Sequence, residues 1–598
     1  MYKLILKLFT FLDNKQRRRF YVLQILVILM GFAEVIGVAS IVPFMSLVGD
    51  TSQLQQDNFV SQVYQATGIA TEEEFIFLLG IGVLIVLTFC AIISMITAWR
   101  LSMFANVVGS EIADKLYTYY LKQNWLFHAS GSSAKLTKQI ANETLRVTNN
   151  ILTPLLLMNS KIGLIIIMII AIFIYDPLVA IVGSLFFGAA YFILYSLVRA
   201  RLLHNGKSIS NVTEQRFSLM NEGFGGIKDI LLLGRDDDFI NRFHQSGQKL
   251  AYSMGNNVTL SLVPRYFMEL VAFGTIIGLL LYLMNNYQSD LSKVLPIISV
   301  YALACIKLLP AFQQVYNSTA NIKGNIAALE SIQKDLESAM QKEINLNNTK
   351  HEYLIPKDEI SLENITFTYP EKEKAVIESL NILIPANNVV GIVGSSGSGK
   401  STIIDILMGL IEPNNGNLKV DNVVIDNENI RQWQNTIGFV AQSIFLSDGT
   451  IAENIAFGIP KNDINQKQVI QALKQAHLYE LVQGLEYGID TLVGERGVKL
   501  SGGQRQRIGI ARALYHKAEV LVFDEATSSL DGVTEKMIMQ AIQNFKGLKT
   551  IILIAHRLKT VQKCDQIFFI ENGQVVDKGT FNDLLKTNSN FKRMAEHS

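Results

Sequence analysis

The residues with the most recognisable chemistry form one short glycine-rich run. In order they are Gly394, Ser395, Ser396, Gly397, Ser398, Gly399, Lys400, Ser401 and Thr402. The apolar run 389–393 precedes them and a helical pattern over 402–410 follows, so the glycines fall on a strand-to-helix turn where backbone N–H groups can bind phosphate oxygens. Lys400 would reach the β- and γ-phosphates of a nucleotide, and the Ser401 hydroxyl would complete the coordination of Mg²⁺.

A second, partial phosphate site follows later in the chain. Leu500 is followed by Ser501, Gly502, Gly503 and Gln504. A serine and two glycines can contact phosphate oxygens, but this stretch has no lysine. We therefore expect it to act together with a glycine-rich run that belongs to another chain.

Two acids and a histidine complete the predicted chemistry. Asp524 and Glu525 end the apolar strand 520–523. Phosphoryl transfer needs a phosphate site, a metal ion and an oriented water, so Asp524 would hold Mg²⁺ directly or through water and Glu525 would polarise the attacking water. His556 follows the strand 550–555, at the edge where α/β folds gather ligands. Alone it would more often be structural, but together with Glu525 it favours catalysis.

Composition separates the chain into two different halves. Its 598 residues predict two or three domains, and 49% apolar with only 18% charged residues is a high apolar content for a soluble protein. A net charge of +1 argues against a nucleic-acid partner recruited by bulk charge. Long apolar runs fill 20–312, whereas short β-branched strands alternate with helical patterns after 330. The first half is predicted to be a membrane domain and the second an α/β domain.

Six segments are apolar enough to span a bilayer, which takes about 20 residues. They are 20–48, 75–99, 151–175, 178–198, 264–284 and 294–312. Lys15, Arg17, Arg18 and Arg19 precede the first, and the loop 49–74 has neither Lys nor Arg, so the N-terminus is predicted to be inside.

The segments between the spans are also patterned. Residues 1–12 are apolar with their basic cluster behind them, which favours an interfacial helix over a signal peptide. Residues 59–64 fit either a short helix on the outer membrane face or a plain capping loop. The segments 100–150 and 199–260 are predicted to extend the membrane helices into the cytoplasm. Short turns near 125–131 and 223–226 could dock onto the second half.

Three cations lie inside the predicted spans. At about 1.5 Å per residue from the outer helix ends, Lys161 and Lys307 lie roughly 20 Å deep and Arg265 roughly 27 Å deep. Intramembrane charges are costly, so one interpretation is a pocket for an anionic phosphate or pyrophosphate head group. In the alternative, Arg265 pairs with Glu269 one turn on, and the lysines reach the inner interface. Glu34 fits a helix-packing partner as well as a substrate contact.

With these motifs in order, the second half resembles the nucleotide-binding domain of ABC transporters. The resemblance implies that adenine stacks on Tyr369, that Gln442 touches Mg²⁺ and senses the membrane domain, and that His556 contacts the γ-phosphate. Residues 491–497 resemble the segment that exporters place near their coupling helices. Residues 500–504 match the family signature, and 528–531 resemble its dimer-contact loop.

The resemblance predicts half of an ABC exporter with ATP and Mg²⁺ as cofactors. The fold class is an all-α polytopic membrane domain of the exporter type with six helices, plus an α/β P-loop nucleotide-binding domain. The predicted parts are an interfacial helix and basic cluster (1–19), the transmembrane domain (20–330), a linker (331–357) and the nucleotide-binding domain (358–598). Because the signature of one domain closes over the phosphate site of another, a homodimer is the simplest assembly, with a heterodimer left open.

The membrane half is similar to bacterial lipid-linked oligosaccharide flippases, through 32–34 with 42–44, 263–265 and 307–310. This resemblance implies that a polyprenyl-pyrophosphate saccharide moves from the inner to the outer leaflet. Arg265 and Lys307 fall on two of the family's basic positions, whereas Cys90 replaces a family arginine and Lys161 could supply the missing charge.

Two other functions fit the same sequence. One is export of other amphiphiles, either drugs or a lipid A-like glycolipid. The other is an ATP-gated receptor or channel that does not pump. In each case the location would be a plasma membrane, most simply the bacterial inner membrane, with the nucleotide-binding domain in the cytoplasm.

Overall fold

The chain folds into two compact units. The computed structural model describes residues 9–49, 51, 54, 59–69, 71–175, 177–286, 291–341, 352–370, 372–525, 532–555 and 557–596. A helical unit spans Met1–Gln123 and Ser130–Ile344, and an α/β unit spans Asn345–Ser598 together with the short segment Asn124–Ala129.

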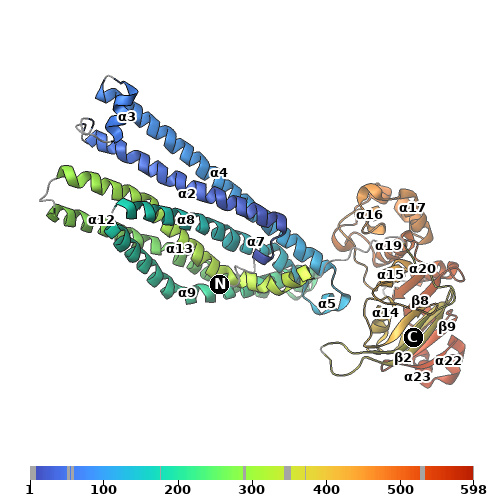
Figure 1. Ribbon diagram of the computed structural model, residues 1–598. Helices are drawn as coiled ribbons and strands as arrows, with labels where there is room; N and C mark the ends of the chain where they lie inside the picture. Colours follow the sequence, from blue (N-terminus) through green and yellow to red (C-terminus); the bar gives the residue numbers. More distant parts are fainter. Residues whose placement is uncertain are drawn as a thin grey trace. The chain divides into compact units, whose positions relative to one another are not determined.

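Long helices make up most of the helical unit (Figure 1). They are α2 (Asn14–Gly49), α4 (Glu72–Leu121), α8 (Thr153–Tyr175), α9 (Pro177–Gly225), α11 (Asp236–Leu262), α12 (Pro264–Asn286) and α13 (Leu291–Gln341). Shorter helices of this unit are α3 (Phe59–Thr67), α6 (Ser133–Lys138), α7 (Thr144–Val147) and α10 (Ile227–Leu233), with π-helical turns η2 (Gln139–Glu143) and η3 (Thr148–Leu152). The short helix α5 (Trp125–Ser130) lies, except for its last residue, in the segment that groups with the α/β unit. Within this unit α2 packs along α4, and α13 packs along both α8 and α9.

Within the described residues, five helical stretches are long and apolar enough to cross a membrane. They are Asn14–Met45, Glu72–Leu121, Ser133–Ile174, Gly183–Gly225 and Asp236–Gly278. The sixth predicted span, 294–312, lies in α13, where several side chains fall outside the described residues. On α4, Leu84, Ile85 and Phe89 are each more than 60% exposed. Apolar side chains that point outward are stable against lipid, so this unit is the predicted helical membrane domain.

The second part of α4 has one buried face. Leu101, Ala105, Val108, Ile112 and Leu116 recur at spacings of three and four residues and are all buried. This spacing places them on one side of the helix, where they pack against other helices of the unit. The same helix therefore changes from a lipid-type surface to a protein-type core along its length.

A network of buried charged side chains connects the short helices that follow α5 to one another and to α9. The Glu143 carboxylate is fully buried and accepts hydrogen bonds from Arg146 Nη1 at 2.9 Å and from Ser210 Oγ at 3.1 Å. Lys138 Nζ lies 3.6 Å from Glu143 and donates to Glu214 at 2.8 Å. These contacts join α6, η2, α7 and α9. Buried charges are tolerated only when they are paired in this way.

Of three segment predictions, one has a wrong boundary, one is decided between its two alternatives, and one lies largely outside the described residues. The predicted linker begins at 331, but α13 continues to Gln341 because Ile332 and Leu336 are fully buried and keep the helix packed. Residues 59–67 form the helix α3, which agrees with the short-helix alternative and not with the capping loop, and Tyr64 packs edge-on against Phe75 at 5.0 Å. Most of the predicted interfacial helix over 1–12 lies outside the described residues.

The α/β unit contains two sheets. Its strands are β1 (Glu359–Phe367), β2 (Ile377–Pro385), β3 (Val389–Gly394), β4 (Asn415–Val420), β5 (Val423–Val424), β6 (Ile437–Val440), β7 (Val520–Asp524), β8 (Thr550–Ala555), β9 (Gln566–Glu571) and β10 (Gln574–Gly579). An antiparallel sheet has the order β2-β1-β4-β5, and a second sheet has the order β10-β9-β3-β8-β7-β6. In the second sheet, β9, β3, β8, β7 and β6 run parallel and only the β9–β10 pair is antiparallel.

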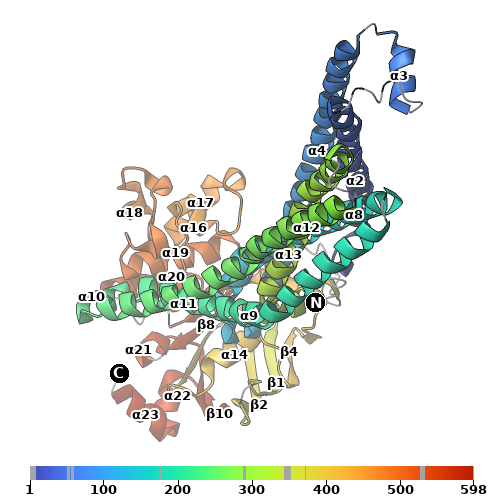
Figure 2. The same cartoon turned by 90° about the vertical axis from the view of Figure 1, so that its left-hand side faces the viewer.

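The α/β unit also contains shorter helices, some packed on the sheets and others grouped at one side of them (Figure 2). They are α14 (Lys400–Leu407), α15 (Ile430–Thr436), α16 (Ile451–Ile455), α17 (Gln466–Gln475), α18 (Tyr479–Gln483), α19 (Gly502–Tyr515), α20 (Gly532–Asn544), α21 (Leu558–Val561), α22 (Phe581–Thr587) and α23 (Ser589–Glu596). Every residue of β3 and β8 is buried, which is the pattern of strands covered on both faces. Because their carboxyl ends meet at one edge, the residues after β3, β6, β7 and β8 converge there.

Candidate functional site

The glycine-rich run forms the turn between β3 and α14. Gly399 caps the helix with φ of 98°, a conformation that L side chains rarely adopt, and a Cβ there would lie 2.8 Å from Ile377 Cδ1. A Cβ at Gly394 would collide with the carbonyl oxygen of Ile570. Ser395, Ser396, Gly397 and Ser401 are exposed, whereas Ser398 and Thr402 are buried. The outer residues of this turn are thus accessible to a ligand.

Lys400 is buried beneath this turn. Its Nζ donates hydrogen bonds to the carbonyl oxygens of Gly394 at 2.9 Å and Ser395 at 2.8 Å. Burial lowers the pKa of Lys400, and the nearby carboxylates of Glu525 and Asp524 oppose that shift. Among the described residues, Ser398 Oγ is buried without a hydrogen-bond partner. A cation and an unsatisfied hydroxyl at one turn fit the binding of a phosphate.

The predicted acids lie at the end of β7, next to the strand that leads to Gln442. Asp524 is the last residue of β7, and β6 pairs with β7 in parallel. Gln442 Nε2 donates to Glu525 Oε2 at 2.8 Å. Glu525 has φ of 48°, and its backbone N–H donates to the carbonyl oxygen of Ile554 at 3.1 Å. A non-glycine residue in this left-handed region is strained, and the contacts around Glu525 hold it there.

The aromatic residue predicted to stack on adenine lies beside the glycine-rich turn between β3 and α14. The Tyr369 hydroxyl is hydrogen-bonded to Thr402 Oγ1 at 3.1 Å. Its ring packs edge-on against Phe367 at a centroid distance of 5.0 Å. The structure therefore brings Tyr369 next to the glycine-rich turn, although Tyr369 precedes Thr402 by 33 residues in the sequence.

Sequence reasoning missed one carboxylate next to this site. Burial raises the pKa of Asp405 on α14 to about 6, the Trp125 side chain counteracts this by hydrogen bonding, and the charge of Asp524 adds to the rise. Leu126 packs against the apolar core that contains Ile403 and Ile404. The segment Asn124–Ala129 thus belongs structurally to the α/β unit. The sequence did contain a clue to this residue, because Asp405 is an acid in the helix that directly follows the glycine-rich turn.

The second glycine stretch begins α19. Ser501 caps this helix: its Oγ accepts from the Gln504 N–H at 3.2 Å, and Gln504 Oε1 accepts from the Ser501 N–H at 2.8 Å. A hydroxyl oxygen that accepts can still donate its own hydrogen, so Ser501 remains able to bind an anion. The N–H groups of Gly502 and Gly503 lie in the first helical turn, where no intrahelical acceptor is available to them. In this chain, the hydrogen bonds with Gln504 hold Ser501 in its position at the start of the helix.

An open hollow of about 840 Å³ lies among three segments of the α/β unit. Its lining includes Gln442, Phe445, Arg496, Gly502 and Arg505. Arg496 belongs to the segment 491–497 and has a left-handed φ of 53°. The segment 491–497, the residues after β6 and the start of α19 therefore all border this hollow. His556 and the loop 528–531 lie outside the described residues.

The membrane cations are each close to a carboxylate. Lys161 Nζ on α8 donates to Glu34 Oε1 on α2 at 3.2 Å, and Lys307 Nζ on α13 lies 3.9 Å from Glu34 Oε2. Arg265 Nε donates to Glu269 Oε1 at 2.8 Å, four residues further along α12. Two of the three predicted substrate residues therefore converge on Glu34, and the third has the intrahelical partner foreseen as the alternative.

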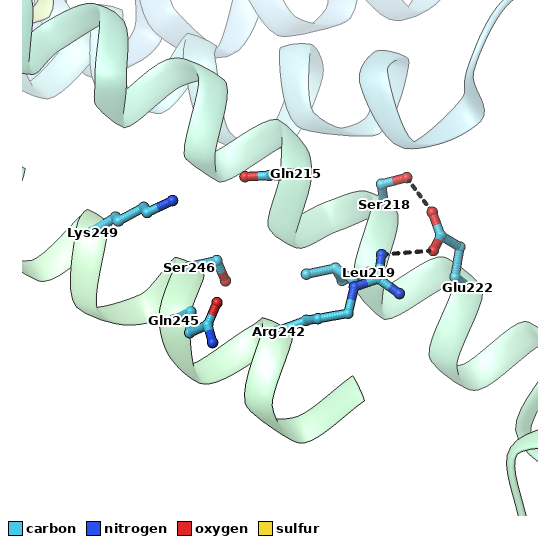
Figure 3. Close-up of a pocket in the computed structure, with 8 residues that line it drawn as sticks. All are labelled: Gln215, Ser218, Leu219, Glu222, Arg242, Gln245, Ser246 and Lys249. Atoms are coloured by element: carbon cyan, nitrogen blue, oxygen red, sulfur yellow. Dashed lines mark hydrogen bonds and ion pairs between the residues drawn. The ribbon is translucent and has the colours of Figure 1, made fainter. Parts of the chain in front are cut away.

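A smaller polar cleft of about 190 Å³ separates α9 from α11 (Figure 3). Within it, Glu222 accepts a hydrogen bond from Ser218 Oγ at 2.9 Å and lies 3.9 Å from Arg242 Nη2. None of the residues predicted to bind nucleotide or substrate lines this cleft.

Comparisons with known proteins agree with both units. Residues 20–303 match the family described as ABC transporter transmembrane region, and residues 377–528 match the family described as ABC transporter. The ATP-dependent lipid A-core flippase of Pseudoalteromonas translucida (strain TAC 125) is 28% identical over 513 residues, which are 84% of this chain and 86% of that protein. The flippase of the same description from Escherichia coli (strain K12) is 30% identical over 390 residues, which are 65% of this chain and 66% of that protein.

A solved structure shows the same fold over nearly the whole chain. It is that of a bacterial Atm1-family ABC exporter with ATP bound, with a TM-score of 0.79, 21% identity, and coverage of 98% of this chain and 99% of the other. The two family matches, the helical membrane unit and the phosphate turn with its acids all point to one assignment. The chain belongs to the ABC transporters, as an exporter half-transporter whose ATP hydrolysis is coupled to transport.

Proposed function

We propose that this half-transporter flips an anionic lipid-linked saccharide, in the first place a polyprenyl-pyrophosphate-linked oligosaccharide, from the inner to the outer leaflet. The observation that supports this substrate class is the convergence of Lys161 and Lys307 on the single carboxylate of Glu34 within apolar helices. Ammonium groups in such surroundings are costly unless they bind an anion, and phosphate is a strong acceptor for them. Arg265 on α12 is proposed as a third cation for the head group.

A lipid A-like glycolipid is the second candidate. It is favoured by the relatives described as ATP-dependent lipid A-core flippases. Both candidates are anionic, phosphorylated and amphiphilic, so the same lysines would suit either. Neutral or cationic drugs would gain nothing from these lysines, which makes drug export a weaker proposal.

The nucleotide chemistry is assigned to residues at the edge of the larger sheet. Lys400 and the backbone of 394–402 would bind the phosphates, and adenine would stack on Tyr369. Glu525 would polarise the attacking water, in a position fixed by its hydrogen bond from Gln442. His556 is proposed to contact the γ-phosphate.

The residues present fit ATP with Mg²⁺. The Ser401 hydroxyl, the Gln442 amide oxygen and the Asp524 carboxylate are the hard oxygen ligands that Mg²⁺ prefers, and they lie on the turn and strand ends that meet at one sheet edge. The unsatisfied Ser398 hydroxyl in the phosphate turn fits an oxygen-rich ligand there. Bound Mg²⁺ would neutralise phosphate charge during hydrolysis.

A second copy of the chain is the proposed partner. Ser501, Gly502 and Gly503 begin α19 and present a partial anion site without a lysine, which fits a phosphate held by the Lys400 turn of another chain. Two equivalent ATP sites would follow from a homodimer. Alternating access driven by closure of the paired nucleotide-binding domains would then move the substrate. The proposed location is the bacterial inner membrane, with these domains in the cytoplasm.

The test compares substrates in proteoliposomes of the full chain. Polyprenyl-pyrophosphate saccharide, lipid A and a hydrophobic cationic dye are each added, and both ATP hydrolysis and lipid translocation are measured. We expect the pyrophosphate lipid to stimulate hydrolysis and to be translocated, whereas stimulation by lipid A alone would favour the second candidate. Hydrolysis with no translocation of any amphiphile would instead favour a receptor or channel.

A charge-removal pair links the substrate to the lysines. Lys307→Met should weaken stimulation by the pyrophosphate lipid at least about tenfold, since a hydrogen bond to a charged group is worth about 1.5–3 kcal/mol. Lys323→Met is the matched control, because Lys323 lies on the same helix beyond the predicted span. Equal behaviour of the two variants would contradict the assigned head-group site.

A further inference from the structure

Glu34 bridges two cations that come from two other helices. Its Oε1 accepts a hydrogen bond from Lys161 on α8, and its Oε2 lies 3.9 Å from Lys307 on α13. The Glu34 side chain is only 12% exposed, compared with 27% for Lys161 and 44% for Lys307. The carboxylate is thus the most enclosed member of a three-helix ion cluster.

The surroundings of this cluster are apolar. Leu164 and Ile165, one turn beyond Lys161, pack with Ala311, one turn beyond Lys307, and all three are buried. Two ammonium groups and one carboxylate leave one positive charge uncompensated within the cluster. Such an excess of positive charge beside buried apolar side chains favours the entry of a further anion.

The two lysines are not held equally. Lys161 makes a hydrogen bond of 3.2 Å, whereas Lys307 is at the limit of an ion pair and is the more exposed. An incoming anion would therefore meet Lys307 first. To take both lysines, it would have to displace Glu34, which is attached to the chain and so has a high effective concentration.

We propose that Glu34 is a built-in competitor that sets the charge a substrate head group must carry. This rests on the proposed function. A pyrophosphate, or a glycolipid with two phosphates, has enough charge and enough oxygens to replace the carboxylate on both lysines. A singly charged phosphodiester, such as the head group of phosphatidylglycerol, does not. Glu34 thereby competes with the abundant phospholipids of the membrane for the two lysines. This competition lowers the affinity for phospholipids more than the affinity for the doubly charged substrate.

The test removes the charge of Glu34 with little change of shape. Glu34→Gln, Glu34→Asp and the wild type are reconstituted in vesicles with rising fractions of phosphatidylglycerol, and the concentration of polyprenyl-pyrophosphate saccharide that half-stimulates ATP hydrolysis is measured. For Glu34→Gln we expect phosphatidylglycerol to raise that concentration at least tenfold. For the wild type and Glu34→Asp, which keep the carboxylate, we expect less than a twofold change.

Glu222→Gln is the matched control for the loss of an acid. Glu222 also pairs with a cation, Arg242, at 3.9 Å, but in the polar cleft between α9 and α11 (Figure 3). It should show wild-type lipid selectivity. The inference is overturned if Glu34→Gln responds to phosphatidylglycerol as the wild type does, or if Glu222→Gln shows the same shift.

A second measurement separates this inference from the proposed substrate. Native mass spectrometry of the purified full chain with added phosphatidylglycerol counts bound lipid without any transport substrate. More bound phosphatidylglycerol on Glu34→Gln than on the wild type supports the competitor role even if the pyrophosphate lipid proves inactive. Equal binding overturns it. Failure of the pyrophosphate lipid to stimulate wild-type hydrolysis would count only against the proposed function.

Discussion

Gln442 and Glu525, although far apart in the sequence, are joined by a hydrogen bond of 2.8 Å from the Gln442 amide to the Glu525 carboxylate. The two residues follow β6 and β7, which are adjacent parallel strands. A proposed Mg²⁺ ligand therefore orients the carboxylate proposed to polarise water. β6 is the last strand of the larger sheet and β7 is its neighbour, so the two groups lie at adjacent strand ends.

Glu525→Gln should reduce ATP hydrolysis at least about 100-fold, because a positioned general base contributes roughly 10²–10⁴ to the rate. The side chain keeps its size and an acceptor oxygen for Gln442, so nucleotide binding should persist. Phosphate release and binding of a fluorescent ATP analogue are the two measurements. Glu519→Gln, one residue before β7 and paired with Lys549 at 3.2 Å, is the control. Retained hydrolysis in Glu525→Gln would remove Glu525 from this role.

Asp405→Asn should stabilise the protein near neutral pH and not in acid. Burial raises the pKa of Asp405 from 3.8 to about 6, so the folded chain prefers the protonated form. Its favourable contribution to folding is full below pH 3.8 and is lost as pH rises through about 6. The amide avoids that loss, a gain of about 1–2 kcal/mol at pH 7.5 after allowance for partial exposure.

Thermal unfolding of the purified protein at pH 7.5 and at pH 5 measures the Asp405 effect. The difference between Asp405→Asn and the wild type should shrink as the pH falls. Asp426→Asn, in the exposed turn before α15, is the control and should show no such trend. A pH-independent difference would contradict the linkage.

Glu143→Gln should destabilise the helical unit by about 3–5 kcal/mol, because it leaves the buried Arg146 guanidinium without its carboxylate. Replacement of both Glu143 and Arg146 by leucine should recover much of that loss, since no unpaired charge remains. Thermal unfolding in detergent measures both. Glu222→Gln removes an exposed ion pair and should cost at most about 1 kcal/mol. A double variant no better than Glu143→Gln would show that the charge pair is not the cause.

Gly206→Ala should separate α9 from α13. A Cβ at Gly206 would collide with the carbonyl oxygen of Gly324, and backbone cannot move aside as a side chain can. Overpacking of this kind costs about 1–3 kcal/mol. Gly188→Ala, on the same helix with open space around the added carbon, is the control and should be close to wild type. Thermal unfolding of both variants checks the prediction, which fails if they behave alike.

The sequence by itself determined the features that depend on local pattern. Backbone geometry explains the pattern of the glycine-rich turn before Lys400 and the place of the acids after 520–523. Bilayer thickness explains the length of the apolar spans. Through their resemblance to the motifs of ABC transporters, these features predicted an ABC exporter half-transporter, which the family matches confirm. The α/β unit was predictable because most of its motifs follow strands, and those strands, β3, β8, β7 and β6, prove to be neighbours in one sheet.

Only the tertiary structure decided which distant side chains share a partner. Glu34, Lys161 and Lys307 lie on three helices, and the rotation of each helix about its axis, which sequence spacing does not fix, brings them to one carboxylate. In the same way, the network around Glu143 and the contact of Trp125 with Asp405 depend on packing between segments distant in sequence. The charge and type of each residue can be read locally, but the energy of a buried charge depends on its neighbours in space.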